Sequence, residues 1–171
     1  ADMGDYLLVA SSDGLFSYNN NRISKYSQLN CRSMYADKKN KLLFVGGNYG
    51  LAIFRITPAP VFLTFVKDIS LTVVSIIKNE NAKSYLEIWL GTAYGGAIRL
   101  ILDRDLKSGA TLYNDNDGLP NGPVLPFTNS KDVLFATNRG LYSFINENKI
   151  LASLADSMKT HPEKIKGYFE S

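Results

Sequence analysis

The feature that most constrains the fold of this chain is a segment that recurs four times. The copies are Leu7–Tyr18 (LLVASSDGLFSY), Leu42–Phe54 (LLFVGGNYGLAIF), Ile88–Leu100 (IWLGTAYGGAIRL) and Val133–Phe144 (VLFATNRGLYSF). Each copy is an apolar run ending in small residues, followed by a short polar turn and a glycine that opens a second run. The anchoring glycines, 36, 46 and 44 residues apart, are Gly14, Gly50, Gly96 and Gly140.

A repeat near 40 to 50 residues built from strands, without a 3.6-residue apolar stripe, is typical of β-propeller blades. The small residues that end the first run, which would let neighbouring blades approach closely, are Ala10, Gly46, Gly91 and Ala136. The turn glycine permits a positive φ in a tight hairpin. The sequence therefore predicts an all-β fold, a β-propeller of about four blades with four antiparallel strands each, as part of a larger propeller.

The expected strands can be written out for each blade. In the third blade they are Thr72–Lys78, Leu86–Thr92, Ala97–Leu102 and Ala110–Tyr113, and in the second Arg32–Ala36, Lys41–Gly46, Leu51–Ile56 and Val61–Val66. The first blade begins at its second strand, Tyr6–Ala10, and the fourth begins with Pro123–Thr128. The predicted blade boundaries are 5–30, 31–70, 71–113 and 123–156, with a tail at 157–171.

The repeat also predicts equivalent positions and their burial. Second strands of successive blades are expected at Leu7–Ala10, Leu42–Val45, Ile88–Leu90 and Val133–Phe135. The side chains expected to be largely buried there are Leu8, Phe44, Trp89 and Leu134.

The tail leaves ring closure open. It contains either a strand, Lys166–Phe169, or a short helix, Ser153–Met158. A strand pairing with Tyr6–Ala10 would close a four-bladed ring. Without that pairing, the chain is an arc of a larger propeller, which is the expected outcome.

Composition excludes several other classes. Hydrophobic residues make up 45% of the chain, and ten Tyr and nine Phe favour strands. The net charge of +3 is spread without a Lys/Arg run, so no nucleic-acid partner is expected. The single cysteine rules out an intrachain disulfide, and apolar stretches such as Pro58–Val66 are too short for a bilayer. The sequence begins at Ala1 without a Met start or a signal peptide, so we expect a trimmed or internal piece.

The third and fourth repeats resemble the two-component-regulator propeller, the sensor repeat of bacterial hybrid sensor kinases and triple-tyrosine regulators. The motifs that carry the resemblance are Asp117–Pro120 (DGLP), Ile88–Thr92 (IWLGT) and Phe135–Tyr142 (FATNRGLY). The first repeat keeps Asp13–Phe16 (DGLF) but has Ala10-Ser11 where the family has Gly-Thr. The second has Gly46-Gly47 and no preceding Gly-Leu-Pro loop. The match is good over about 60 residues and partial elsewhere.

The resemblance implies a ligand-sensing or binding module rather than an enzyme, and a periplasmic or other extracytoplasmic location. It implies a carbohydrate-like or other small ligand and no cofactor. The expected partners are that small-molecule or glycan ligand, further blades or domains of a longer chain, and a second copy in a homodimer. Two alternatives stay open: a propeller-fold polysaccharide hydrolase or lyase, and a purely protein-interaction propeller.

In propellers, the loops between second and third strands, and those leading to the next blade, share one face around the channel mouth. Asn, Asp, Arg and Tyr in such loops can hydrogen-bond to and stack on sugars. The predicted ligand-binding residues are Asp13, Asn48, Tyr49, Tyr94, Asp115, Asp117, Asn121, Asn138 and Arg139. The alternative is that these residues only form turns.

Other sites are disfavoured by their sequence context. Aligning Gly118 with the sixth position of an EF-hand loop puts Tyr113 and Val124 at ligand positions, which argues against calcium. His161 is the only histidine, so no His-based metal cluster is expected. Four further residues are not assigned to a functional site. Cys31 is expected to be a buried structural thiol, Trp89 a core residue, and the Asp103 and Asp105 pair to lie away from the channel mouth.

Overall fold

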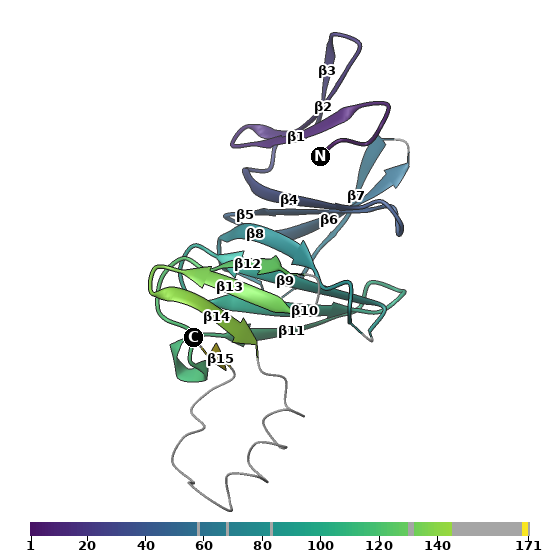
Figure 1. Cartoon of the computed structure of the whole chain (residues 1–171). Helices are drawn as coiled ribbons and strands as arrows, with labels where there is room; N and C mark the ends of the chain where they lie inside the picture. Colours follow the sequence, from purple (N-terminus) through teal and green to yellow (C-terminus); the bar gives the residue numbers. More distant parts are fainter. Residues whose placement is uncertain (58, 68, 83, 130–131, 145–168, 171) are drawn as a thin grey trace, which may run out of the picture.

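The computed structural model describes residues 1–57, 59–67, 69–82, 84–129, 132–144 and 169–170. These residues form four antiparallel sheets and one short 3-10 helix, η1 (Asp115–Asp117), so the prediction of an all-β fold is confirmed. The sheets, numbered 1 to 4 in chain order, follow one another along the molecule (Figure 1). Within the described residues, no helix has the length and apolar character needed to cross a membrane.

Each sheet is a meander of strands consecutive in the chain. Sheet 1 contains β1 (Leu7–Ser11), β2 (Gly14–Asn19) and β3 (Arg22–Ser27), and sheet 2 contains β4 (Cys31–Asp37), β5 (Leu42–Gly47), β6 (Gly50–Thr57) and β7 (Ala59–Phe65). Sheet 3 contains β8 (Val73–Lys78), β9 (Leu86–Thr92), β10 (Ala97–Leu102) and β11 (Ser108–Tyr113). Sheet 4 contains β12 (Leu125–Thr128), β13 (Val133–Thr137), β14 (Gly140–Phe144) and β15 (Phe169–Glu170).

All four repeat segments form the expected hairpins, β1–β2, β5–β6, β9–β10 and β13–β14. Leu8, Phe44 and Trp89 are at most 1% exposed, as predicted. Leu134 is partly buried, so burial is less complete at this position than at the other three. Its neighbours Val133 and Phe135 are buried instead, since they lie on the face of β13 that packs against sheet 3.

Successive sheets bury their faces against each other. We call the face turned to the next sheet in the chain the forward face, and the face turned to the preceding sheet the backward face. At the first junction Leu8 packs with Leu43 and Val45, and at the second Phe44 packs with Ile88 and Leu90. At the third junction Trp89 packs with Val133 and Phe135. Sheets 2 and 3 are therefore covered on both faces over their inner strands, whereas the outer strands β7 and β11 are largely exposed.

Small residues allow this close approach at two junctions, as the sequence predicted. A Cβ at Gly46 would lie 2.6 Å from Cγ1 of Val73 in the next sheet. A Cβ at Gly91 would overlap the carbonyl oxygen of Val124 and lie 2.6 Å from Cδ of Pro126. The inner strand β8 adjoins β4 on one side and β12 on the other. Gly46 and Gly91 permit this approach because they have no side chain.

The turn glycines adopt the predicted positive φ, with values of 141°, 91°, 102° and 131° along the chain. At Gly14, Gly50 and Gly96 a Cβ would also overlap a carbonyl oxygen at or just after the last strand of the same sheet. These three hairpins lie directly against that backbone. Their glycines are therefore needed for two reasons, the positive φ and the lack of a side chain.

The described part of the tail joins sheet 4. Phe169 pairs with Phe144 and Glu170 with Ser143, so β15 is the fourth strand of this sheet. The pairing of the tail with β1, on which a closed four-sheet ring depended, is absent from the described residues. The predicted Ser153–Met158 helix, most of the Lys166–Phe169 strand and the last residues of the fourth predicted blade lie outside the described residues.

Replacing Gly96 with Ala is expected to lower the free energy of unfolding by about 3 kcal/mol, because the new Cβ meets both backbone strain and the Tyr113 carbonyl. Chemical denaturation measures the loss. Gly109→Ala is the matched control, since its Cβ would meet nothing within 4 Å, and it should change stability by less than about 0.5 kcal/mol. Equal effects at the two positions would contradict this account.

Candidate functional site

The predicted ligand residues lie on the hairpins and on the loop between sheets 3 and 4. Seven of them, Asp13, Asn48, Tyr94, Asp115, Asn121, Asn138 and Arg139, are exposed, whereas Tyr49 and Asp117 are half-buried. Tyr94 is 78% exposed. The seven exposed side chains are therefore accessible to a ligand.

The loop between sheets 3 and 4 brings some of these residues together. Asn121 donates from Nδ2 to Oδ2 of Asp115 over 3.0 Å. A Cβ at Gly122 would lie 3.5 Å from Nδ2 of Asn138, so this loop passes beside the β13–β14 hairpin. Asp115, Asn121 and Asn138 therefore form one polar group at this end of the sheets.

Asp117 has a local structural role. Its Oδ2 accepts a hydrogen bond from the backbone N–H of Asn114 over 2.9 Å, while the Asn114 side chain accepts from the N–H of Asn116. The two side chains form a capping box around η1. Turn formation thus accounts for Asp117, as the alternative interpretation of the sequence anticipated.

The predicted ligand residues in the hairpin of sheet 2, Asn48 and Tyr49, also make contacts within the protein. Oδ1 of Asn48 accepts from Nε of Arg32 over 2.8 Å. The Tyr49 ring packs edge-on against Phe65 with centroids 5.5 Å apart, and its hydroxyl donates to Sγ of Cys31 over 4.0 Å. Burial raises the pKa of Tyr49 above its ordinary value. In the described part of the chain, no hydrogen bond links Asp13, Asn48 or Tyr94 to the Asp115 group.

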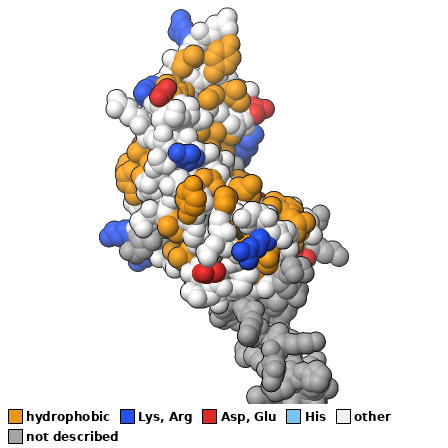
Figure 2. Space-filling view, turned by 90° about the vertical axis from the view of Figure 1, so that its left-hand side faces the viewer, with side chains coloured by type: hydrophobic (Ala, Val, Ile, Leu, Met, Phe, Trp, Pro, Cys, Tyr) orange, Lys and Arg blue, Asp and Glu red, His pale blue; other side chains and the backbone are white. Residues whose placement is uncertain are grey.

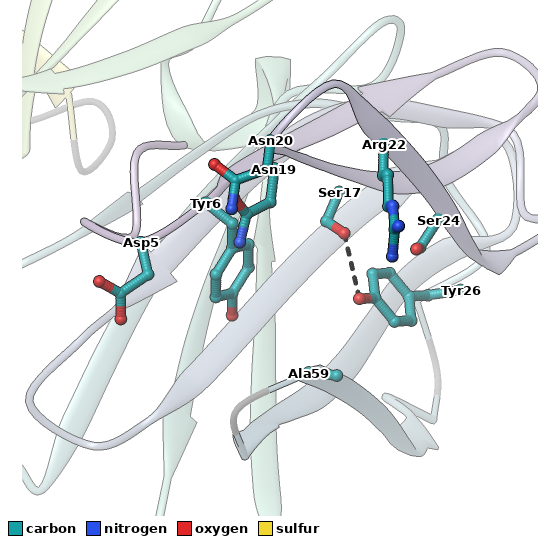
Figure 3. A pocket seen from close by; sticks show the side chains of 9 residues that line it. All are labelled: Asp5, Tyr6, Ser17, Asn19, Asn20, Arg22, Ser24, Tyr26 and Ala59. Carbon is teal, nitrogen blue, oxygen red and sulfur yellow. Dashed lines mark hydrogen bonds between the residues drawn. The ribbon is translucent and has the colours of Figure 1, made fainter.

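Sequence reasoning missed a polar hollow of about 660 Å³ that lies between sheet 1 and the β6–β7 hairpin (Figure 3). Its walls carry two phenols, two amides, two hydroxyls and one charge of each sign. The lining residues are Asp5, Tyr6, Ser17, Asn19, Asn20, Arg22, Ser24, Tyr26 and Ala59. Figure 3 shows these side chains on both sides of the opening above Ala59. None of the nine predicted ligand residues is among them.

At one position beside the hollow, sheet 1 is polar where sheet 2 is apolar. The residue paired with Leu8 in register is Ser17, whereas the residue paired with Phe44 is Ile53. Ser17 is buried and hydrogen-bonds through Oγ to the hydroxyl of Tyr26 over 3.1 Å. The second repeat has an isoleucine at this position and the fourth has a serine, Ser143, so the serine alone did not mark the hollow in the sequence.

The third junction is filled where the first is open. Trp89 lies 4.9 Å from the ring centroids of Phe135 and of Phe144, and Tyr113 lies 5.6 Å from Phe169. These aromatic contacts leave the forward face of sheet 3 covered. The polar opening is thus a particular feature of the junction between sheets 1 and 2.

A buried carboxylate, Glu87, lies inside the third junction. It accepts hydrogen bonds from Nε1 of Trp89 at 2.9 Å, Nδ2 of Asn79 at 2.8 Å and Nη2 of Arg99 at 2.7 Å. Arg99 in turn lies over the Phe144 ring, 5.6 Å from its centroid. Burial alone would raise the pKa of Glu87, but the bonds from Arg99, Asn79 and Trp89 outweigh burial and lower that pKa. These bonds occupy the carboxylate and give Glu87 a structural role.

The remaining sequence interpretations have clear outcomes. Trp89 is a core residue, and Cys31 is buried, with a pKa raised by burial. Asp103 accepts from the backbone N–H groups of Asp105 and Lys107, each over 2.9 Å, and so forms the β10–β11 turn at the opposite end of sheet 3 from the β9–β10 hairpin. Among described residues there is no group of three potential metal ligands, and His161 lies outside them.

Comparison with known proteins adds no assignment. No protein-family model matches the sequence, and no curated protein matches it either. The site must therefore be judged from its own geometry.

The Glu87 network predicts a specific pH dependence. Because the folded-state pKa is lowered, the stability it contributes is present above the unfolded-state pKa of about 4.3 and is lost as pH falls through the folded-state value. Glu87→Gln should lower the free energy of unfolding at pH 7 by about 1–3 kcal/mol and reduce the loss on acidification. Asp37, whose pKa is also lowered, should retain part of the slope.

Urea denaturation between pH 3 and 7 measures this effect. The exposed turn variant Asp105→Asn is the control and should follow the wild-type curve. An unchanged slope in Glu87→Gln would show that the buried network does not govern acid stability.

Proposed function

We propose that the chain is a run of β-propeller blades that acts as a ligand-binding module of a bacterial signalling regulator. The sheet arrangement supports the propeller, because the first strands β4, β8 and β12 of successive sheets adjoin each other and each sheet packs face to face on the next. The repeat motifs support the regulator class and an extracytoplasmic location. The ligand is a small, polar, carbohydrate-like molecule.

The observation that carries this proposal is the polar hollow at the first junction. Its volume of about 660 Å³ falls in the range of small-molecule sites, roughly 300–1,000 Å³. Tyr6 and Tyr26 present ring surfaces, and Asn19, Asn20 and Arg22 present hydrogen-bonding groups. Such a mixture suits a neutral polyhydroxylated ligand, which needs many hydrogen bonds and an apolar ring contact but no strong net charge.

Binding is favoured over hydrolysis. Among the described residues that line the hollow, Asp5 is the one carboxylate, whereas glycoside hydrolases ordinarily use two. At the loop end of the sheets, Asp115 and Asp117 are both engaged in local hydrogen bonds. We therefore propose a module without catalytic residues.

The polar group at the loop end is the second candidate for the same function. Asp115, Asn121 and Asn138 lie together there, and Tyr94 and Arg139 are exposed on the neighbouring hairpins. This group lies on the protein surface and does not line the hollow at the first junction. It therefore ranks below the first junction as a ligand site.

A thermal-shift experiment with a panel of neutral disaccharides and oligosaccharides tests both sites. We expect a binding sugar to raise the Tm of the wild type, since a ligand at 100 times its Kd stabilises by about 2.7 kcal/mol. The double variant Asn19→Ala/Arg22→Ala should keep its ligand-free Tm within a few degrees and lose the response, because both side chains are exposed.

The matched control is Tyr94→Ala/Arg139→Ala, whose side chains are exposed at the other end of the sheets. It should keep both the Tm and the response. Loss of the response in this control alone would move the ligand to the loop end. Release of a shorter sugar would indicate an enzyme, and no response to any sugar would contradict the carbohydrate proposal.

A further inference from the structure

A second hollow, of about 640 Å³, lies at the end of sheet 3 that carries the β10–β11 turn. Its volume falls in the range of small-molecule sites, roughly 300–1,000 Å³. Apolar contact surface in this hollow comes from Tyr85, Ile101, Leu102 and Ala110. No residue of this lining belongs to the hollow at the first junction, so the two hollows are separate sites.

Two cations from the β10–β11 turn, Arg104 and Lys107, belong to the same lining. Both side chains are exposed, and among the described residues neither forms an ion pair. Asp103 is the one carboxylate in the described lining, and its Oδ1 already accepts from the backbone N–H groups of Asp105 and Lys107, each over 2.9 Å. The lining therefore has a net positive charge, and its carboxylate is engaged in the turn that carries the two cations.

A neighbouring turn adds further positive charge. The Tyr85 hydroxyl donates to Oδ1 of Asn40 over 3.1 Å, so the turn between β4 and β5 of sheet 2 lies beside this hollow. Lys39 and Lys41, on either side of Asn40 in the chain, are both exposed. Cations from two sheets thus surround the opening.

The carboxylates at this junction are occupied. Asp37 at the end of β4 and Glu80 after β8 both pair with Lys78, over 3.3 and 2.9 Å. In the part of the chain that the structure describes, Lys39 and Lys41 form no ion pair. Figure 2 shows hydrophobic side chains along much of one side of the molecule, with few charged groups among them, so this cationic region differs from most of that side.

Two further features leave hydrogen-bonding capacity and room for a ligand. Oγ of Ser84 is buried and has no hydrogen-bond partner among the described residues. A buried hydroxyl without a partner costs free energy, which an acceptor on a ligand would recover. A Cβ at Gly109 would meet nothing within 4 Å, so the space over this residue of the lining is open.

We propose that this second hollow binds a small organic anion, with a carboxylate or phosphate group on an apolar body. Arg104 and Lys107 contact the oxyanion, because guanidinium and ammonium groups donate charge-assisted hydrogen bonds to carboxylate and phosphate oxygens. Tyr85 and Ile101 contact the apolar body. This inference does not depend on the ligand or the site proposed above.

NMR titration of the full 171-residue chain with benzoate and with phenyl phosphate, at low salt, tests the proposal. At least one of these anions should bind saturably, and more tightly than either neutral benzyl alcohol or inorganic phosphate, because neither of those compounds has both parts. The anion that binds more tightly identifies the oxyanion. Gly109→Leu, which fills open space, and the double variant Arg104→Ser/Lys107→Ser should each weaken that binding at least about fivefold.

The matched charge control is Lys67→Ser, since Lys67 is exposed and lines neither hollow. It should bind the anions as the wild type does. All the substituted residues are exposed, so melting curves should keep each Tm within a few degrees of the wild type. The proposal is overturned if the wild type binds neither anion saturably, or if either hollow variant keeps wild-type affinity. Equal weakening by Lys67→Ser would show a general charge effect and would also overturn this site.

Discussion

The structure depends on one constraint: each sheet has two apolar faces, and a single sheet cannot bury both. Sheets 2 and 3 satisfy this by lying between neighbours, with the side chains of Phe44 and Trp89 inserted into the junctions that follow them. The close approach needs Gly46 and Gly91 at the strand ends and a glycine at three of the four hairpins, Gly14, Gly50 and Gly96. The sequence repeat therefore reflects a repeated packing arrangement, in which each sheet buries an apolar face against the next sheet.

The junctions differ where one repeat position changes chemistry. The residues paired with Leu8, Phe44 and Trp89 are Ser17, Ile53 and Arg99. Isoleucine continues the apolar core, and arginine forms a partly buried ion pair with Glu87 over 2.7 Å. Serine is one of the residues that line the hollow that we propose as the ligand site. Sheets of the same fold can thus differ in chemistry through the side chain at one equivalent position.

The same constraint governs the ends of the stack. Sheet 1 exposes the kind of face that sheets 2, 3 and 4 bury, and sheet 4 exposes the kind that sheets 1, 2 and 3 bury. Apolar surface of this kind is costly when it is left exposed to water. The ligand site that we propose lies elsewhere, at the polar edge of the first junction.

The sequence by itself determined the strands, the hairpin glycines and the burial of Leu8, Phe44 and Trp89, because these follow from short-range alternation and backbone geometry. Only the tertiary structure decided which faces are covered. Leu134 follows the local pattern and is still less buried than Leu8, Phe44 and Trp89, since burial depends on a neighbouring sheet. In the same way, Phe169 pairs with β14, and the hollow lies away from the predicted loops, because both depend on contacts between segments distant in the chain.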